Sequence, residues 1–147
     1  MIFSEPPKDF QPRRPVVGCW VVHDGKFVLL HRPLHKSHGG KWGVPAGKME
    51  LGETEVQAMV RELFEETGIQ VAEEDLQFFR KVYVRYADSD FAYVMFSLAL
   101  ANAPVIQIRD GEHDAYQWVT PENATDLPLM HDLEECIDMF FPKKKFY

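Results

Sequence analysis

The sequence predicts a single α/β domain built on a mixed β-sheet. Its 147 residues are the size of one ordinary domain, and 46% of them are hydrophobic, which is enough for one core. Three patterns carry the prediction: a hairpin signal near the start, one well-capped amphipathic helix in the middle, and two long β segments after that helix.

The beginning of the chain predicts an arm followed by a β-hairpin. Prolines among polar residues indicate that residues 1–14 form a poorly structured arm, and that one domain covers residues 15–147. From Val16 to Arg32, two apolar runs flank Asp24-Gly25, which is a strong hairpin turn signal. We therefore expect the first two sheet strands here.

The middle of the chain predicts a short strand and one helix. Pro45 ends a strand at Trp42-Gly43-Val44. Thr54 and Gln57 form a capping box at the start of the helix, and Gly68 is a natural C-cap. Apolar residues recur at helical spacing between them, which predicts a buried face: Val56, Met59, Val60 and Leu63.

The second half of the chain predicts mainly strands. Two long segments, Leu76–Tyr86 and Phe91–Ala101, are joined by a turn at Asp88-Ser89-Asp90. Pro121 suits the first turn of a helix. Three further elements are expected in order: short strands at Val105–Ile108 and Tyr116–Thr120, and an amphipathic helix at about Met130–Phe141.

Charge is distributed unevenly along this acidic chain. The net charge is −7, which disfavours binding to long nucleic acids, because a polyanion must be met by Lys and Arg. Residues 1–46 hold three acids against seven bases, whereas residues 47–69 hold six acids against two bases. A basic segment therefore runs directly into a compact acidic one, and we expect the chemistry at that junction.

The start of the sequence and its two cysteines indicate a soluble, cytoplasmic protein. No basic segment followed by an apolar run marks a secretory signal, and no apolar stretch approaches the roughly 20 residues of a membrane-spanning helix. Cys19 and Cys136 lie far apart, without the spacing of a zinc site or a disulfide framework. We expect both to be buried structural thiols.

Three glutamates share one face of the predicted helix. Glu62, Glu65 and Glu66 stand at positions i, i+3 and i+4, without a lysine among them. A solvated acidic face is one interpretation. The other is a site for a hard divalent cation such as Mg²⁺, which prefers oxygen ligands, because a glycine-bracketed loop with Glu53 precedes the cluster and Arg61 stands beside it.

The acidic segment resembles the motif of the Nudix hydrolases. Gly47, Glu53 and the run Arg61-Glu62-Leu63-Phe64-Glu65-Glu66-Thr67-Gly68-Ile69 match the Nudix box at each defining position. The resemblance implies an α/β/α sandwich around a mixed sheet, with the box as a loop–helix–loop. It also implies a Mg²⁺-dependent enzyme, with Mn²⁺ as a substitute.

The resemblance also assigns roles to residues of the box. Glu65 and Glu66 are the expected main metal ligands, and Glu62 is either a further ligand or the general base that deprotonates water. Arg61 and Glu53 are the expected orienting pair. Where many members have Gly-Gly, this chain has Ala46-Gly47, and the Ala46 carbonyl remains a candidate ligand if the backbone there suits a residue with a Cβ.

Residues outside the box complete the expected site. Glu112 lies in a Glu-His-x-Ala-Tyr-x-Trp segment that resembles several nucleotide-hydrolysing members, and it is either a metal ligand, an alternative base or an exposed loop acid. His113 either contacts a substrate phosphate or sits on the surface. Arg32, at the end of the hairpin, is either a phosphate-binding residue or part of a surface salt bridge.

The expected reaction is hydrolysis of a phosphoanhydride bond in a nucleoside di- or triphosphate derivative, by attack of water on phosphorus. Dinucleoside polyphosphates and nucleotide sugars are the alternative substrates. Tyr86, placed 17 residues after the box, resembles the tyrosine of the dinucleoside polyphosphate hydrolases, whereas the ADP-ribose hydrolases have a proline there, and this resemblance favours polyphosphates. A nucleotide-binding module without catalysis is the competing function. The expected partner is a small nucleotide, with no membrane and no long nucleic acid, and a homodimer stays an open alternative.

Overall fold

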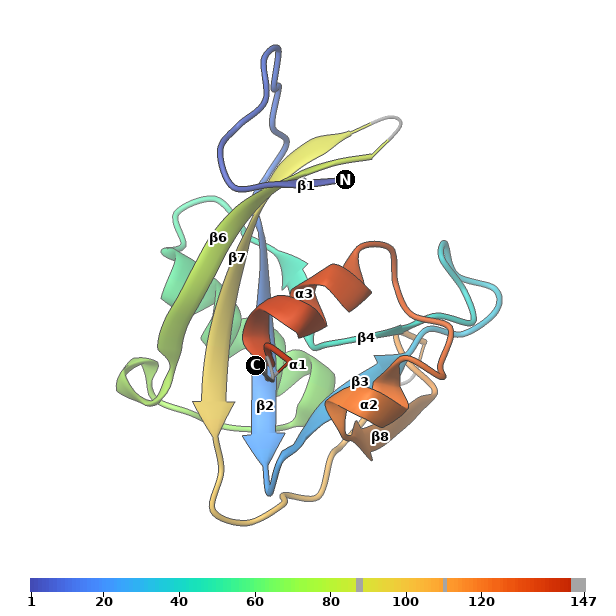
Figure 1. Cartoon of the computed structure of the whole chain (residues 1–147). Coiled ribbons are helices and arrows are strands. Elements are labelled where there is room, and N and C mark those ends of the chain that lie inside the picture. Colours follow the sequence, from blue (N-terminus) through green and yellow to red (C-terminus); the bar gives the residue numbers. More distant parts are fainter. Residues whose placement is uncertain (87–88, 110, 144–147) are drawn as a thin grey trace.

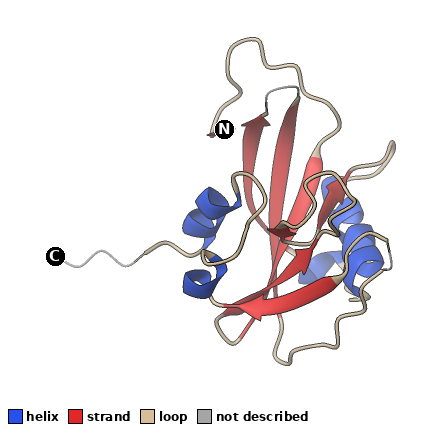
Figure 2. Ribbon diagram, turned by 90° about the vertical axis from the view of Figure 1, so that its right-hand side faces the viewer, coloured by secondary structure: helices blue, strands red, loops and turns tan. Residues whose placement is uncertain are grey.

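One mixed eight-stranded sheet with helices on both faces forms the molecule (Figures 1 and 2). The computed structural model describes residues 1–86, 89–109 and 111–143. The strands are β1 (Ile2–Phe3), β2 (Val16–His23), β3 (Lys26–His31), β4 (Trp42–Gly43), β5 (Ala46–Lys48), β6 (Gln77–Arg85), β7 (Asp90–Ala99) and β8 (Ala115–Val119). The helices are α1 (Glu55–Thr67), α2 (Pro121–Ala124) and α3 (Leu133–Phe140), with a 3₁₀ turn at Glu73–Asp75.

The strand order is β1-β6-β7-β2-β3-β4, with β5 paired to β2 and β8 paired to β3. The two central strands, β2 and β7, run parallel from Val16 opposite Tyr93 to Val22 opposite Ala99. The neighbouring pairs β2–β3 and β6–β7 are antiparallel. The predicted mixed sheet and the α/β/α sandwich are therefore confirmed.

The hairpin and the helix form where local sequence predicted them. Asp24 and Gly25 both have positive φ, 51° and 72°, as the tight turn between twisted strands requires. Thr54 and Gln57 make the reciprocal capping box of α1, and the N–H of Gly68, at φ 77°, donates to the Phe64 carbonyl. Both predictions are confirmed.

Two apolar cores lie on opposite faces of the sheet. On one face α1 buries Ala58, Met59 and Leu63 against β2 and its neighbours. On the other face α3 packs Cys136 and Ile137 near Trp20 and Phe27. Both cysteines are buried free thiols, as expected. Within the described ranges, no helix is long and apolar enough to cross a membrane.

The structure departs from the predicted elements at several places. Residues 105–108 form no strand, and only Ile106 of this segment is buried, with the Gln107 N–H donating to the Thr67 carbonyl. The last helix spans only Leu133–Phe140. Strand β5, directly after Pro45, was missed. The predicted turn at Asp88 falls outside the described residues.

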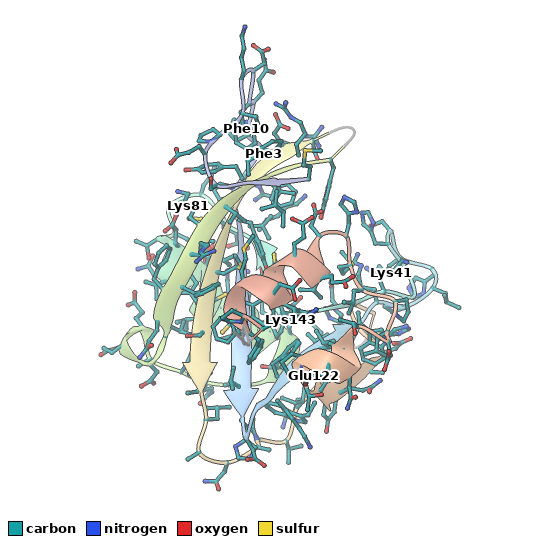
Figure 3. All side chains as sticks on the ribbon, viewed as in Figure 1. Phe3, Phe10, Lys41, Lys81, Glu122 and Lys143 are labelled. Atoms are coloured by element: carbon teal, nitrogen blue, oxygen red, sulfur yellow. The ribbon has the colours of Figure 1, made fainter. Side chains whose placement is uncertain are left out.

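The first residues of the chain are more ordered than predicted. Ile2 and Phe3 form β1, which pairs with Val84 and Tyr83 at the edge of β6. Phe10 packs edge-on against the ring of Tyr83, and Figure 3 shows Phe3 and Phe10 gathered at this end of the sheet. The prolines exclude a long strand here, but side-chain and edge contacts hold the arm. Its separation from a domain at residues 15–147 stays a prediction.

Asp90, the first residue of β7, ties the arm to the sheet. Its carboxylate accepts two hydrogen bonds from Arg85, at 2.8 and 3.0 Å, and one from the Gln11 backbone N–H at 2.8 Å. The Asp90 carbonyl accepts from the Arg13 N–H. The bonds from Arg85 and Gln11 hold the pKa of Asp90 down to about 2. The carboxylate therefore stays charged at any ordinary pH.

We expect Asp90→Asn to loosen the arm without unfolding the sheet. The amide removes the charge that Arg85 pairs with and leaves the Gln11 N–H with a weaker acceptor. Hydrogen–deuterium exchange at residues 2–13 should become faster, while exchange in β2 and α1 should not change. The matched control is Asp138→Asn, at an exposed position of α3. Equal protection of the arm in both variants would contradict the proposed tether.

Candidate active site

Arg61 organises the loop between β5 and α1. Its guanidinium donates to both oxygens of Glu53, at 2.7 and 2.9 Å, and to the Lys48 carbonyl at 3.1 Å. Glu53 in turn accepts from the Glu50 N–H at 2.8 Å. The hydrogen bonds from Arg61 and Glu50 lower the pKa of Glu53 to about 2. This two-pronged pair ties the loop to the helix, and its role in orienting the catalytic groups stays a prediction.

The same guanidinium also contacts the acidic face of α1. It donates to Glu62 at 2.7 Å and to Glu65 at 3.2 Å. One cation thus partly balances three carboxylates. Among the described residues, no three His, Cys, Asp or Glu side chains already stand together as a metal-binding group. Arg61 bonds to Glu62 and Glu65 of this face, whereas the Glu66 carboxylate accepts from the Ala46 N–H.

Gly47 makes room for Glu62. A Cβ built on Gly47 would lie 2.1–2.4 Å from the carboxylate carbon and oxygens of Glu62. Only a residue without a side chain therefore lets Glu62 lie against β5. Burial raises the pKa of Glu62, against the lowering effect of Arg61. Gly47 does not adopt a positive φ, so its backbone conformation does not require a glycine. The glycine is required because the Glu62 carboxylate occupies the space of a side chain.

Glu66 and Glu62 are the largely buried members of the cluster. The side chain of each is 12% exposed, whereas that of Glu65 is 37% exposed. One Glu66 oxygen accepts from the Ala46 N–H at 2.8 Å. Burial raises the pKa of Glu66 to about 8, and the nearby carboxylates of Glu62 and Glu112 add to the rise. A buried carboxylate among other carboxylates is a fit for a divalent cation.

The backbone at Ala46 accommodates its methyl group. Ala46 is absent from the residues with positive φ and lies in β5 opposite Gly18. The departure from Gly-Gly therefore causes no strain, and the N–H of Ala46 positions Glu66. The roles of the Ala46 carbonyl and of Glu62, Glu65 and Glu66 as metal ligands stay predictions. So does the role of Glu112, which is exposed on the loop before β8.

A pocket of about 520 Å³ opens beside Glu66. Its lining comes from strands β2, β5, β6 and β7, from Glu66 of α1, and from the segment before and at the start of α3. Basic and aromatic side chains both belong to this lining. The basic set is Arg13, Arg14, Arg32, His38 and Lys48, and the aromatic set is Tyr86, Phe91 and Tyr93.

The structure brings Arg32 and His113 to the pocket together with Glu66. Arg32 donates through Nε to the Ser37 carbonyl at 2.9 Å, which steadies its guanidinium at the pocket wall. His113 is buried, and its Nδ1 lies 4.0 Å from Glu66. Burial and the charge of Arg32 lower the pKa of His113. Contact of either residue with a substrate stays a prediction.

Sequence reasoning missed several pocket residues. Tyr93 crosses over Gly18, where a Cβ would lie 2.1 Å from the Tyr93 hydroxyl, so this glycine admits the ring into the pocket. Asp132 also lines the pocket, in a left-handed conformation, φ 67°. Arg13 and Arg14 reach the pocket only because the arm folds back. The available signal in the sequence was Gly18, because a glycine inside an apolar strand indicates that another group approaches the backbone closely.

Comparison with known proteins identifies the family. The model of the NUDIX domain matches residues 12–140, so the chain belongs to the Nudix family. The CTP pyrophosphohydrolase of Escherichia coli K12 is 32% identical over 116 residues, covering 78% of this chain and 81% of that protein. Phosphatase NudJ of the same strain is 33% identical over 129 residues, covering 82% and 80%.

The solved structures agree with this assignment. The solution structure of the E. coli ORF135 protein has a TM-score of 0.72 at 27% identity, and the match covers 88% of this chain and 89% of that chain. The protein is therefore a hydrolase of the Nudix family, as the box predicted. Members of the family in general use divalent metal ions.

We expect Gly47→Ala to displace Glu62 and to lower turnover while the fold is kept. The new methyl group collides with the end of a flexible side chain, so Glu62 moves and the strand stays in place. Loss of a positioned base or ligand predicts a fall of about 100-fold or more in kcat. Steady-state kinetics and thermal melting measure both parts.

A double variant provides the control for Gly47→Ala. If the substitution acts through Glu62, adding it to Glu62→Gln should lower kcat no further, because both changes remove the same contact. Additive losses, or an unchanged kcat in Gly47→Ala alone, would contradict this explanation of the glycine.

We expect Glu66→Gln to stabilise the protein in the presence of a chelator. The amide oxygen still accepts from Ala46, and the variant removes a carboxyl group that ionises freely in the unfolded chain but whose ionisation in the folded protein is opposed by burial and by two nearby carboxylates. A gain of about 1 kcal/mol would raise the melting temperature by roughly 3 °C in a domain of this size. Glu74→Gln, at an exposed position of the 3₁₀ turn, is the control and should change nothing. A lower melting temperature for Glu66→Gln would contradict the proposed cost of burial.

Proposed function

We propose that the protein hydrolyses a phosphoanhydride bond in nucleoside di- or triphosphate derivatives, with Mg²⁺ as cofactor and Mn²⁺ as a substitute. The observation that carries this proposal is the position of Glu66, a buried carboxylate that lines the same pocket as a set of cations and aromatic rings. Such a pocket suits a ligand that carries both phosphates and a flat apolar group.

The residues of the chain divide the reaction between them. When bound at Glu65 and Glu66, the cation polarises phosphoryl oxygens and lowers the pKa of water. Arg32 and Lys48 lie at the pocket wall near the box, where they meet phosphate oxygens. Glu62 or Glu112 takes the proton from water. The water oxygen then forms a bond to phosphorus while the bridging P–O bond breaks, and the outer phosphates leave.

Charge balance supports this division. Arg61 has its five N–H groups directed at Glu53, Glu62, Glu65 and the Lys48 carbonyl, so it orients the loop and the helix face. Glu66 lacks such a partner and shows the strongest effect of burial in the cluster. A cation that neutralises Glu66 and draws Glu65 or Glu62 toward it would complete the site.

The aromatic lining of the pocket supports a nucleoside as the organic part of the substrate. The rings come from β7, which carries Phe91 and Tyr93, and from Tyr86 directly after β6. Nucleoside triphosphates are the first candidates, followed by dinucleoside polyphosphates and nucleotide sugars. A relative named CTP pyrophosphohydrolase supports the first of these, since its name describes release of pyrophosphate from a nucleoside triphosphate.

A nucleotide-binding module without catalysis is the weaker alternative. Glu53, Glu62, Glu65 and Glu66 are all present, and loss of box carboxylates would be expected of such a module. Tight nucleotide binding without a metal and without turnover would favour it.

The same proposal includes a cytoplasmic location and a small-molecule partner. The two free, buried thiols suit a reducing compartment. The net charge of −7 disfavours long nucleic acids. A homodimer remains a prediction, and the exposed apolar side chains Leu34 and Leu51 are the positions at which a partner copy would first be sought.

The purified protein with Mg²⁺ should release a nucleoside monophosphate and pyrophosphate from at least one nucleoside triphosphate. A panel of triphosphates, dinucleoside polyphosphates and nucleotide sugars, with products separated by chromatography, measures this. Reaction in ¹⁸O-labelled water should place the label on a phosphate product, because water attacks phosphorus. Absence of turnover across the panel would overturn the proposed function.

Glu65→Gln and Glu66→Gln should each lower turnover by roughly 100-fold or more, since each removes a charged ligand of the cation. Circular dichroism and thermal melting should show that both variants fold. Glu74→Gln, whose side chain lies outside the pocket, is the control and should keep wild-type turnover. Normal turnover in both box variants would remove the metal assignment.

A further inference from the structure

His113 has a buried polar atom, Nδ1, that lies near the Glu66 carboxylate. The residue is 7% exposed, and its Nδ1 has no hydrogen-bond partner among the described residues. A buried, unpaired ring nitrogen costs free energy, so its persistence at a site requires an explanation. The Glu66 carboxylate oxygen Oε2 lies 4.0 Å away, outside hydrogen-bond distance by about 1 Å.

Backbone hydrogen bonds hold the segment that carries His113, so its side chain has a defined position. The His113 N–H donates to the Arg109 carbonyl, and the next residue, Asp114, donates from its N–H to the His31 carbonyl. The Asp114 carboxylate also bonds to the His31 ring. Directly afterwards, β8 pairs with β3 from Ala115 opposite His31. These contacts fix the position of the imidazole beside α1.

The two oxygens of Glu66 have different surroundings. Oε1 accepts from the Ala46 N–H at 2.8 Å, while Oε2 faces His113. A carboxylate held at one oxygen can still rotate about that contact. A second donor on the other oxygen would lock the plane of the carboxylate and leave its remaining lone pairs directed at a cation.

We propose that His113 is a positioning residue for the metal ligand Glu66. Its Nδ1–H would donate to Oε2 of Glu66 once a small movement closes the gap of 4.0 Å, and it would hold the carboxylate that would bind the cation. This inference rests on the proposed function, because it takes Glu66 as a ligand. Ligating carboxylates in metal sites are commonly held by such outer hydrogen bonds, and loss of one typically costs about 10–100-fold in metal affinity.

The geometry favours this role over direct contact with a substrate. The Nδ1 atom is hidden from solvent and lies 4.0 Å from Oε2 of Glu66, whereas the cationic residues Arg32 and Lys48 both line the pocket. The structure thus points from His113 toward the carboxylate, in place of the phosphate contact that the sequence left open.

The inference is tested by the affinity of the protein for Mn²⁺ in the absence of nucleotide. The protein is titrated with Mn²⁺, and electron paramagnetic resonance measures the concentration of the free ion. His113→Leu keeps much of the volume and removes the donor, and its Mn²⁺ affinity should fall by about 10–100-fold. His113→Asn places an amide N–H near the position of Nδ1, and it should restore most of the affinity. His35→Leu, at an exposed position outside the pocket, is the control and should bind Mn²⁺ as the wild type does.

Two further measurements separate positioning from other roles. If His113 acts through Glu66, His113→Leu should add no loss of affinity in a Glu66→Gln background. In kinetics, the defect should appear in the Mg²⁺ concentration needed for half-maximal rate, with the nucleotide KM at saturating Mg²⁺ unchanged. His113→Ala replaces the Leu variant if melting curves show that the Leu variant does not fold.

The outcomes are distinguishable from a failure of the proposed function. Wild-type Mn²⁺ affinity in His113→Leu would overturn the inference, and so would an unchanged metal requirement with a raised nucleotide KM, which would make His113 a substrate ligand. If the wild type binds no Mn²⁺, or if Glu66→Gln leaves binding unchanged, the metal assignment itself fails.

Discussion

The site depends on the guanidinium of Arg61 and its contacts with Glu53, Glu62 and Glu65. Without a cation at that position, three carboxylates on a loop and a helix would repel one another, and the loop between β5 and α1 would lose the bonds that tie it to the helix. Arg is suited to this position because its planar fork meets several oxygens at once, whereas an ammonium group acts as a single point charge.

The arrangement leaves one carboxylate with less compensation than the others. Glu66 is held by a single backbone N–H from β5 and faces the pocket and His113. Burial of this carboxylate raises the free energy of the protein without a ligand. The residue lines the cavity in which a ligand would be bound. Buried groups of this kind are common at functional sites, where they lower the stability of the free protein but are already positioned to bind a ligand.

The sheet explains how distant parts of the chain meet at this cavity. Parallel pairing of β2 with β7 places Tyr93 across Gly18, and pairing of β2 with β5 places Ala46 beside Glu66. The arm and the segment before α3 close the pocket from other sides. Each of these contacts joins residues that are far apart in sequence, so each depends on the complete sheet.

Local sequence alone determined the hairpin at Asp24-Gly25, the capped helix α1 and the shared face of Glu62, Glu65 and Glu66, because these depend on neighbours within a few residues. The strand predicted at residues 105–108 from its apolar composition is wrong, because this segment pairs with no neighbouring strand among the described residues. Only the tertiary structure decided that Glu66 is buried, that the arm adds β1, and that His113 faces Glu66. Burial and long-range pairing are properties of the assembled sheet, and no periodicity in the chain encodes them.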